Sequence, residues 1–528
     1  MKILRLRDLA FVLPCTMLLA AGLAAIQPGA FWIGWIGFEC VLALGALALV
    51  AAVRWAGGGR ALTVMSALAL GLRLLAGTAV YLVLPIDGYD EPDDRAGHIF
   101  TDAHRRDDQA WELATSEAPI WSAFDRGFYT DQYGGLLALS AATYRVLSPD
   151  AHRQLLILAL AALAAALGVP FFFMATARLW DAKLSAAATW LYCLYPESVL
   201  TGGAQMREPF LLTSIAVVLW GFAQWLEDRP RASWIWLGIG FGGLLLVSPG
   251  IALGLLVLLA VWLRIRGEPI RATVPLGIVG AGIFLAALLF MAWGVRSTAE
   301  GAGTPVGVVV RWFQDSVGWV IYQLERGSGQ VQNVFSKLFP AAQFVFVIAY
   351  GVTQPLLPPA FLEPTTLSWH VIGILRSAGW YMLLPLLAYS PFAIRQLPAG
   401  TPRRVWTWLA VFSWLWILLC AVRAGGDQWD NPRYRLIFLG IQALVASAAW
   451  LAWLANRDAW LPRILAAEVV CLLLFGQWYL ARYYLVGIHF PIMVVMALCA
   501  SAVVIIMVGG AIWDRRRIRG GRTRRACR

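Results

Sequence analysis

The stretch ALTVMSALALGLRLLAGTAVYLVL, from Ala61 to Leu84, is continued by PIDGYDEPDDRAGHIFTDAHRRDD, from Pro85 to Asp108. The first part is apolar and long enough for a helix to cross the hydrocarbon core of a bilayer. The second part belongs to the most acidic segment of the chain. Because charged side chains are costly inside a bilayer, this pattern predicts a membrane helix that runs into a polar loop.

The whole chain has the composition of an integral membrane protein. Of its 528 residues, 60% are hydrophobic and only 14% are charged, whereas soluble domains are about 45–50% apolar. The apolar runs are continuous rather than alternating, which is typical of helices and not of barrel strands. We therefore predict an all-α integral membrane protein that is a polytopic helical bundle.

Apolar runs recur along the chain and predict about 14 spans. We place them at residues 9–26, 32–53, 61–84, 155–176, 184–200, 209–226, 234–247, 251–263, 274–293, 371–394, 405–422, 436–454, 464–480 and 491–512. Two shorter apolar segments follow long loops: Tyr133–Leu147 is predicted to be an interfacial helix, and Pro340–Val352 a re-entrant or interfacial element.

We interpret residues 1–513 as one membrane domain. It has a first outer loop with interfacial helices at 85–151 and a second long outer segment at 294–370. Residues 514–528 are a basic tail.

Basic residues decide the predicted orientation. The net charge is +12, but much of the excess lies in the tail and in short loops, which indicates membrane topology and not nucleic-acid binding. Lys and Arg concentrate in cytoplasmic loops. If both termini are cytoplasmic, the loops that carry Arg54, Arg178 and Arg395 are cytoplasmic too, and the acidic loop lies outside.

Three groups of polar residues then lie on the outer side. In the first, from Asp102 to Ala114, carboxylates lead into an amphipathic helix. The second is the turn from Thr201 to Glu208, before Pro209 opens a helix. The third, from Arg423 to Arg435, ends at the mouth of a later span. Ionisable groups beside the membrane are functional candidates because their burial is costly.

The order of these groups resembles the GT-C superfamily of membrane glycosyltransferases. Asp102, then Asp107 and Asp108, then the helix Ala110-Trp-Glu-Leu-Ala114 look like the first outer loop of that family. Residues Tyr129–Tyr144 are similar to the juxtamembrane element that follows it. The acidic loop of this chain follows the third span, whereas that of the family usually follows the first.

A second box strengthens the resemblance. Asn431-Pro-Arg-Tyr-Arg-Leu436 is similar to the Arg-Tyr-Arg-Leu-Pro box of many bacterial members, with Ile437 in place of the proline. The members resembled most are protein O-mannosyltransferases, the lipid A aminoarabinose transferase and lipopolysaccharide-core sugar transferases.

The resemblance implies transfer of a hexosyl or pentosyl group, with inversion, at the outer face of the cell membrane. The donor would be a polyprenyl-phosphate sugar in the lipid bilayer, and the acceptor a glycan, a lipid or a protein. Asp102, Asp107 and Asp108 are the candidates for the catalytic base. An attacking hydroxyl needs a carboxylate to take its proton, and a leaving phosphate needs a cation, so the residues fit this chemistry independently.

Four further residues are predicted to bind substrate. Arg433 and Arg435 would hold the donor phosphate, since the planar guanidinium matches phosphate oxygens, and Tyr434 between them is also assigned to substrate binding. Glu208 would position the acceptor or, where the reaction uses a metal ion, would be a ligand of that ion. No cofactor is certain, although a divalent metal is possible. The structural alternatives are a solvated surface for the acids and lipid anchoring for the arginines.

Two other functions fit a protein with many spans. A transporter or flippase for lipid-linked saccharides would typically have internal repeats and charges near mid-membrane. A polysaccharide polymerase or ligase would have basic outer loops. We find no convincing repeat, and the first long loop is acidic, so the transferase is favoured. Glu39 and Arg73, inside two predicted spans, are candidates for a structural pair.

Overall fold

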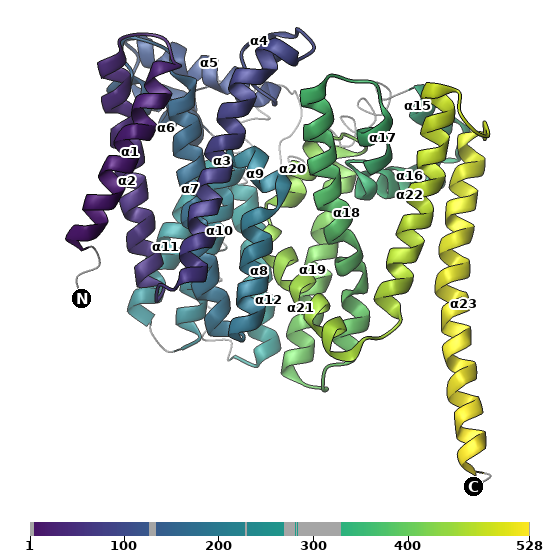
Figure 1. The fold of residues 1–528 in the computed structure, drawn as a ribbon. Helices are drawn as coiled ribbons and strands as arrows, with labels where there is room; N and C mark the ends of the chain where they lie inside the picture. The colour runs from purple at the N-terminus through teal and green to yellow at the C-terminus, as the bar shows by residue number, and fades with distance from the viewer. Residues whose placement is uncertain are drawn as a thin grey trace, which may run out of the picture. The chain divides into compact units, whose positions relative to one another are not determined.

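The computed structural model describes residues 5–125, 134–227, 230–268, 280, 282 and 329–526, and the elements among them are helices (Figure 1). The first part contains α1 (Leu6–Ala25), α2 (Phe31–Trp55), α3 (Arg60–Asp87), α4 (Pro92–Arg95), α5 (Thr101–Thr115), η1 (Ile120–Phe124), α6 (Gly135–Leu147), α7 (Gln154–Leu179), α8 (Ala182–Leu194), α9 (Pro196–Gly202), α10 (Glu208–Trp225), α11 (Pro230–Val247) and α12 (Pro249–Arg266). The second part contains α15 (Gly329–Lys337), α16 (Pro340–Thr353), α17 (Leu357–Leu362), α18 (Leu367–Arg395), α19 (Thr401–Ala424), α20 (Asp430–Leu436), α21 (Leu439–Asn456), α22 (Trp460–Tyr484) and α23 (Ile492–Ala526).

The prediction of an all-α, polytopic membrane protein is confirmed. Within the described residues, 10 helices are long and apolar enough to cross a membrane: α1, α2, α3, α7, α12, α18, α19, α21, α22 and α23. Two other predicted spans coincide with α10 and α11. The predicted span at 274–293 lies outside the described residues, apart from residues 280 and 282, as does the segment 294–328 of the second long outer loop.

One predicted span, at 184–200, is divided in the structure. α8 ends at Leu194, and Tyr195 takes a ψ of 120° that is not helical. A proline ring disfavours helical geometry in the residue before it, so Pro196 ends α8 and opens α9. This break leaves the last carbonyls of α8 without partners inside the helix.

The break also explains why the proposed pair of Glu39 and Arg73 is wrong. Arg73 donates hydrogen bonds to the carbonyl oxygen of Cys193 at 3.2 Å and to Oγ of Ser198 at 2.7 Å. Glu39 instead accepts a hydrogen bond from Oγ1 of Thr16 at 2.9 Å. The carbonyl freed at the end of α8 therefore contacts Arg73 in the place where the sequence suggested a carboxylate.

The chain divides into two compact units. The first comprises Met1–Asp315 with Arg433–Leu444, and the second Ser316–Pro432 with Val445–Arg528. The single membrane domain at 1–513 and the tail at 514–528 remain predictions. In the second unit, α22 packs against α17, α18 and α23.

In the first unit, α7 is the central helix. It packs against α2, α3, α8 and α10, and it is apolar on all sides, as expected of a helix with neighbours all around. Small residues such as Ala159, Ala162 and Ala166 are fully buried and allow neighbouring helices to approach closely. Phe172 of α7 lies against Gly440, which ties the segment Arg433–Leu444 to this unit.

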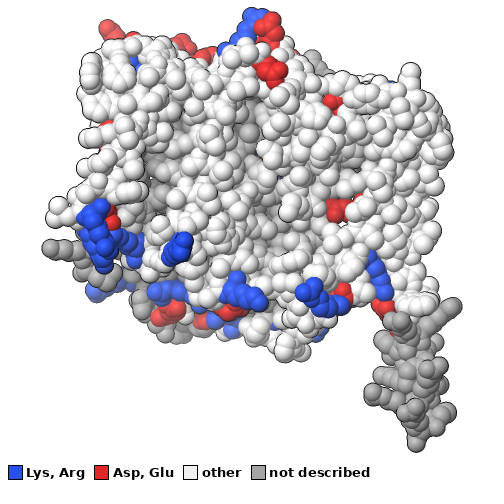
Figure 2. Space-filling model, viewed as in Figure 1, with Lys and Arg blue, Asp and Glu red and all other residues white. Residues whose placement is uncertain are grey.

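The two ends of the first unit differ in charge (Figure 2). On the face shown, Asp and Glu gather at the end that carries α4 and α5, whereas Lys and Arg gather at the opposite end. At the basic end, Arg54 pairs with Asp8, and Arg178 pairs with Glu227. The positive-inside rule assigns such an end to the cytoplasm. Cytoplasmic termini and an outer acidic loop remain predictions.

Gly77 allows α3 to approach the turn before α10. A Cβ atom built there would lie 2.3 Å from the carbonyl oxygen of Gly203 and 2.4 Å from Leu158. We expect Gly77→Ala to lower the melting temperature in detergent, because overpacking typically costs about 1–3 kcal/mol. Gly71→Ala is the matched control on the same helix, since no atom of the described chain lies within 4 Å of a Cβ there. Equal melting temperatures of the two variants would contradict this packing.

Candidate functional site

Asp102 lies in the first turn of α5, where the helix dipole favours a carboxylate. Its side chain is half-exposed, at 51%. Its Oδ2 atom accepts a hydrogen bond from Nη2 of Arg433 at 3.0 Å. Asp102 therefore forms a charge-assisted contact with a residue 331 positions further along the chain.

Glu208 lies in the first turn of α10, just before Pro209. The carboxylate is completely buried, and neither of its oxygens has a hydrogen-bond partner among the described residues. Its ion-pair partner is Arg433, whose Nε lies 3.9 Å from Oε1. A buried carboxylate with two available acceptor oxygens is costly for folding alone, which makes Glu208 a candidate for ligand binding.

Arg433 joins these two carboxylates. It is only 4% exposed, and its guanidinium carbon lies 5.4 Å from the ring centre of Phe100 and 5.7 Å from that of Tyr434. These distances are typical of cation–π contacts. We call the group formed by Asp102, Glu208 and Arg433 the Arg433 site; the structure brings together these three predicted residues from separate parts of the sequence.

Two further cations act on this group and were not identified from the sequence. Nη1 of Arg106 donates to the carbonyl oxygen of Gln205 at 2.8 Å, which links α5 to the turn before Glu208. The positive charges of Arg106 and Arg207 both act on Asp102. Arg106 stands four positions after Asp102 on a helix, and this spacing is the sequence signal that would have indicated the contact.

The pKa of Asp102 reflects two opposing influences. Burial raises the pKa, but the charge and hydrogen bond of Arg433, helped by Arg106 and Arg207, outweigh burial and hold it below the usual aspartate value. Asp102 is therefore ionised at neutral pH. While it is paired with Arg433, however, it is a weak base, because a general base works best with a pKa near the working pH.

Asp107 belongs to a different group, on another face of α5. It is completely buried, and the hydroxyl of Tyr144 donates a hydrogen bond to its Oδ1 atom. Nε2 of His152 lies 2.9 Å and Nε2 of His98 3.7 Å from Oδ2, as close contacts that do not have the geometry of a hydrogen bond. These contacts anchor α5 to α6 and to the segment before α7.

The pKa of Asp107 also lies well below the usual value. Burial raises it, but the neighbouring imidazoles of His152 and His98 outweigh burial. The sequence did not indicate this cluster, since His152 lies 45 positions after Asp107 and no local pattern links them. Packing of Trp111 on His152, with ring centres 5.1 Å apart, helps to hold the imidazole in place.

Asp108 lies on the surface of α5 and is 59% exposed. Its Oδ2 atom is 3.3 Å from Nε2 of His104, and Nδ1 of the same imidazole is 2.7 Å from Asp93. The three predicted catalytic carboxylates therefore have three different surroundings: Asp102 faces Arg433, Asp107 is enclosed by histidines, and Asp108 is solvated.

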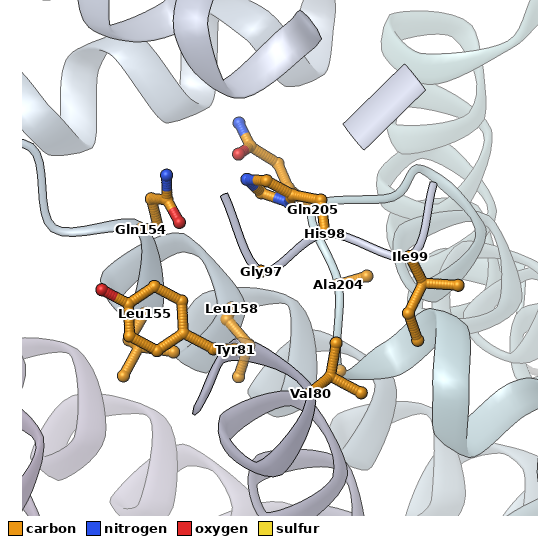
Figure 3. Close-up of a pocket in the computed structure, with 11 residues that line it drawn as sticks. Val80, Tyr81, Gly97, His98, Ile99, Gln154, Leu155, Leu158, Ala204 and Gln205 are labelled. Carbon is orange, nitrogen blue, oxygen red and sulfur yellow. The ribbon is translucent and has the colours of Figure 1, made fainter. Parts of the chain in front are cut away.

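A small cavity lies beside the Asp107 cluster, between α3, the start of α7 and the turn before α10 (Figure 3). Its volume is about 20 Å³, enough for one water molecule and too small for a sugar. Three of its polar atoms lack a hydrogen-bond partner among the described residues: Nε2 of His98, Oε1 of Gln154 and Oε1 of Gln205. The cavity is suited to hydrating this cluster.

Tyr434 and Arg435 differ in their relation to the Arg433 site. Tyr434 places its ring beside the guanidinium of Arg433. Arg435 is only 1% exposed, and its carbonyl oxygen accepts a hydrogen bond from Nε2 of Gln442 at 2.9 Å. Residues two apart on a helix do not face each other, so Arg433 and Arg435 lie on different faces of α20.

The donor set at the Arg433 site does not fit a metal ion. Its two carboxylates share one guanidinium, which lies in contact with both and offsets one of their two negative charges. Elsewhere in the described ranges, no group of three His, Cys, Asp or Glu side chains is arranged to hold a metal. We therefore derive no step through a metal.

Comparison with solved structures finds archaeal oligosaccharyltransferases from Archaeoglobus fulgidus. AglB in complex with an inhibitory peptide and a dolichol-phosphate has a TM-score of 0.36 and 13% identity. The apo form has a TM-score of 0.40 and 12% identity, and the form tethered with an acceptor peptide containing the NVT sequon has 0.39 and 15%. Each match covers 82% of this chain and 55% of the other.

The chain thus spans about half the length of these proteins. No protein-family model matches the sequence. No curated protein matches it either. At TM-scores below 0.5, the similarity to the solved structures does not identify a family.

Proposed function

We propose that this protein is a membrane glycosyltransferase of the GT-C type, which moves a sugar from a polyprenyl-phosphate donor to an acceptor at the outer face of the cell membrane. One observation carries the proposal: Asp102, Glu208 and Arg433, from three separate segments, meet in one group. This group combines a carboxylate that can accept a proton with a cation that can hold a phosphate.

The proposed reaction assigns one role to Asp102 and another to Arg433. The acceptor hydroxyl oxygen forms a bond with the anomeric carbon, and Asp102 takes the hydroxyl proton. The bond from the anomeric carbon to the phosphate oxygen breaks, and its electron pair stays on the phosphate. Arg433 stabilises that charge through its planar N–H groups. Attack opposite the leaving phosphate inverts the anomeric carbon.

Glu208 is proposed to position the acceptor. Its two oxygens have no hydrogen-bond partner among the described residues, so they are available to hydrogen-bond donors of a bound acceptor. A hydrogen bond in a buried site is stronger than the same bond in water. Tyr434 supports Arg433 with its ring, and we propose that Arg435 has a structural role. Asp108, which is exposed, is the second candidate for the base.

The proposed topology follows from the charge difference between the ends of the first unit. Both termini are cytoplasmic, and α5 with the Arg433 site lies on the outer side. The donor phosphate then reaches Arg433 from the outer leaflet, where its polyprenyl chain is anchored.

The proposal is tested with the purified protein in liposomes that contain radiolabelled polyprenyl-phosphate sugars. We expect transfer of label to an added glycan, lipid or protein acceptor, whereas protein-free liposomes should give none. Movement of the donor between leaflets without transfer would contradict the proposal and indicate a flippase. Growth of a lipid-linked polymer would instead indicate a polymerase.

A further inference from the structure

We propose that Asp102 and the phosphate of the donor compete for Arg433, so that donor binding releases Asp102 to act as the base. This inference rests on the proposed function and adds an order of binding to it: the donor binds first, and the acceptor is deprotonated only afterwards.

The two carboxylates that contact Arg433 differ in how easily a ligand can displace them. Glu208 is completely buried and is fixed in the first turn of α10. Asp102 is 51% exposed, whereas Arg433 is only 4% exposed. A phosphate that approaches Arg433 from solvent therefore meets Asp102, and displacing its flexible side chain costs less than moving a buried carboxylate.

The chemistry of the guanidinium supports an exchange of partners. Nη2 of Arg433 is bonded to Asp102 at 3.0 Å, while Nε faces Glu208 at 3.9 Å. A phosphate binds best when two N–H groups of one guanidinium point at its oxygens. Asp102 occupies Nη2, so a phosphate that binds Arg433 through Nη2 displaces Asp102 from it.

The exchange would change the basicity of Asp102. In the structure, Arg433 holds the pKa of Asp102 below its usual value. A phosphate on Arg433 removes that hydrogen bond and brings a negative charge nearby, and both changes favour the protonated carboxyl. Asp102 thus becomes a stronger base when the donor is in place. After transfer, departure of the polyprenyl phosphate lets Asp102 return its proton to water and pair with Arg433 again.

The inference predicts an unusual effect of removing a carboxylate. In lipid nanodiscs, undecaprenyl phosphate alone serves as the probe, and its dissociation constant is measured for each variant. Asp102→Asn should bind the probe more tightly than the wild type, on the order of fivefold, since a competing ion pair is worth roughly 1 kcal/mol. Arg433→Gln should bind it more weakly than the wild type.

Two controls keep the result interpretable. Glu112→Gln removes an exposed carboxylate further along α5 and should leave the dissociation constant unchanged, which excludes a general charge effect. Arg433→Lys keeps the charge and should restore part of the binding lost in Arg433→Gln, which separates a binding defect from misfolding. Equal or weaker binding of the probe by Asp102→Asn would overturn the inference.

Failure of the inference can be distinguished from failure of the proposed function. If the wild type transfers sugar but Asp102→Asn does not bind the probe more tightly, the competition is wrong and the transferase stands. If Asp102→Asn binds the probe more tightly but the wild type transfers nothing to any acceptor, the proposed function is wrong although the competition is supported.

Discussion

Replacement of Asp102 by asparagine should lower the rate of sugar transfer by roughly 10²–10⁴-fold, the usual contribution of a general base. Asparagine has the same shape and can still accept the hydrogen bond from Arg433, which is 3.0 Å away in the wild type, but it cannot take the proton of the acceptor hydroxyl. The measurement is the initial rate of label transfer in proteoliposomes at saturating donor and acceptor.

The control for this prediction is Glu112→Gln, on the exposed surface of the same helix, which should transfer at a rate close to that of the wild type. Tighter binding of undecaprenyl phosphate by Asp102→Asn, together with the loss of transfer, would indicate that the variant is folded. Full activity of Asp102→Asn would remove Asp102 as the base. Loss of transfer in Asp108→Asn would then assign that role to Asp108.

Replacement of Asp107 by alanine should destabilise the first unit by about 3–5 kcal/mol, the typical cost of removing one partner from a buried charged network. The change removes the acceptor of the Tyr144 hydroxyl and the carboxylate that lies against the imidazoles of His98 and His152. Asp108→Ala, one position further and mostly exposed, is the matched control and should cost much less. Thermal unfolding in detergent measures both variants.

The stabilising contribution of Asp107 depends on pH in a definite direction. Because the pKa of Asp107 is lower in the folded protein than in the unfolded chain, its stabilising contribution is fully present above about pH 4 and decreases as the pH falls further. The difference in stability between the wild type and Asp107→Ala should therefore narrow as the pH falls below about 4. A difference that stays constant between pH 7 and pH 3 would show that the pKa of Asp107 is the same in the folded protein as in the unfolded chain.

Much of the site could be proposed from the sequence because its residues stand beside strong local signals. Asp102 precedes an amphipathic helix, Glu208 precedes a helix-opening proline, and Arg433 precedes a span. Each of these signals is local in sequence, and together they placed the candidates on the predicted outer side. The structure added that these three residues are in contact.

Other features could not be predicted, since each depends on partners far apart in the chain. The division of roles among Asp102, Asp107 and Asp108 depends on which face of α5 meets Arg433 and which meets the histidines. The partners of Arg73 depend on the break between α8 and α9, which leaves the carbonyl of Cys193 available. A sequence shows that such groups need partners but does not show which ones they meet.

The sequence by itself determined the class of protein and the existence of its spans, because the cost of exposing backbone and charge to hydrocarbon acts on each segment separately. Only the tertiary structure decided which polar residues contact one another. Asp102 and Glu208 contact Arg433, whereas Asp107 contacts the histidines of its own cluster. The physical reason is that burial and pairing of charges depend on packing between distant helices.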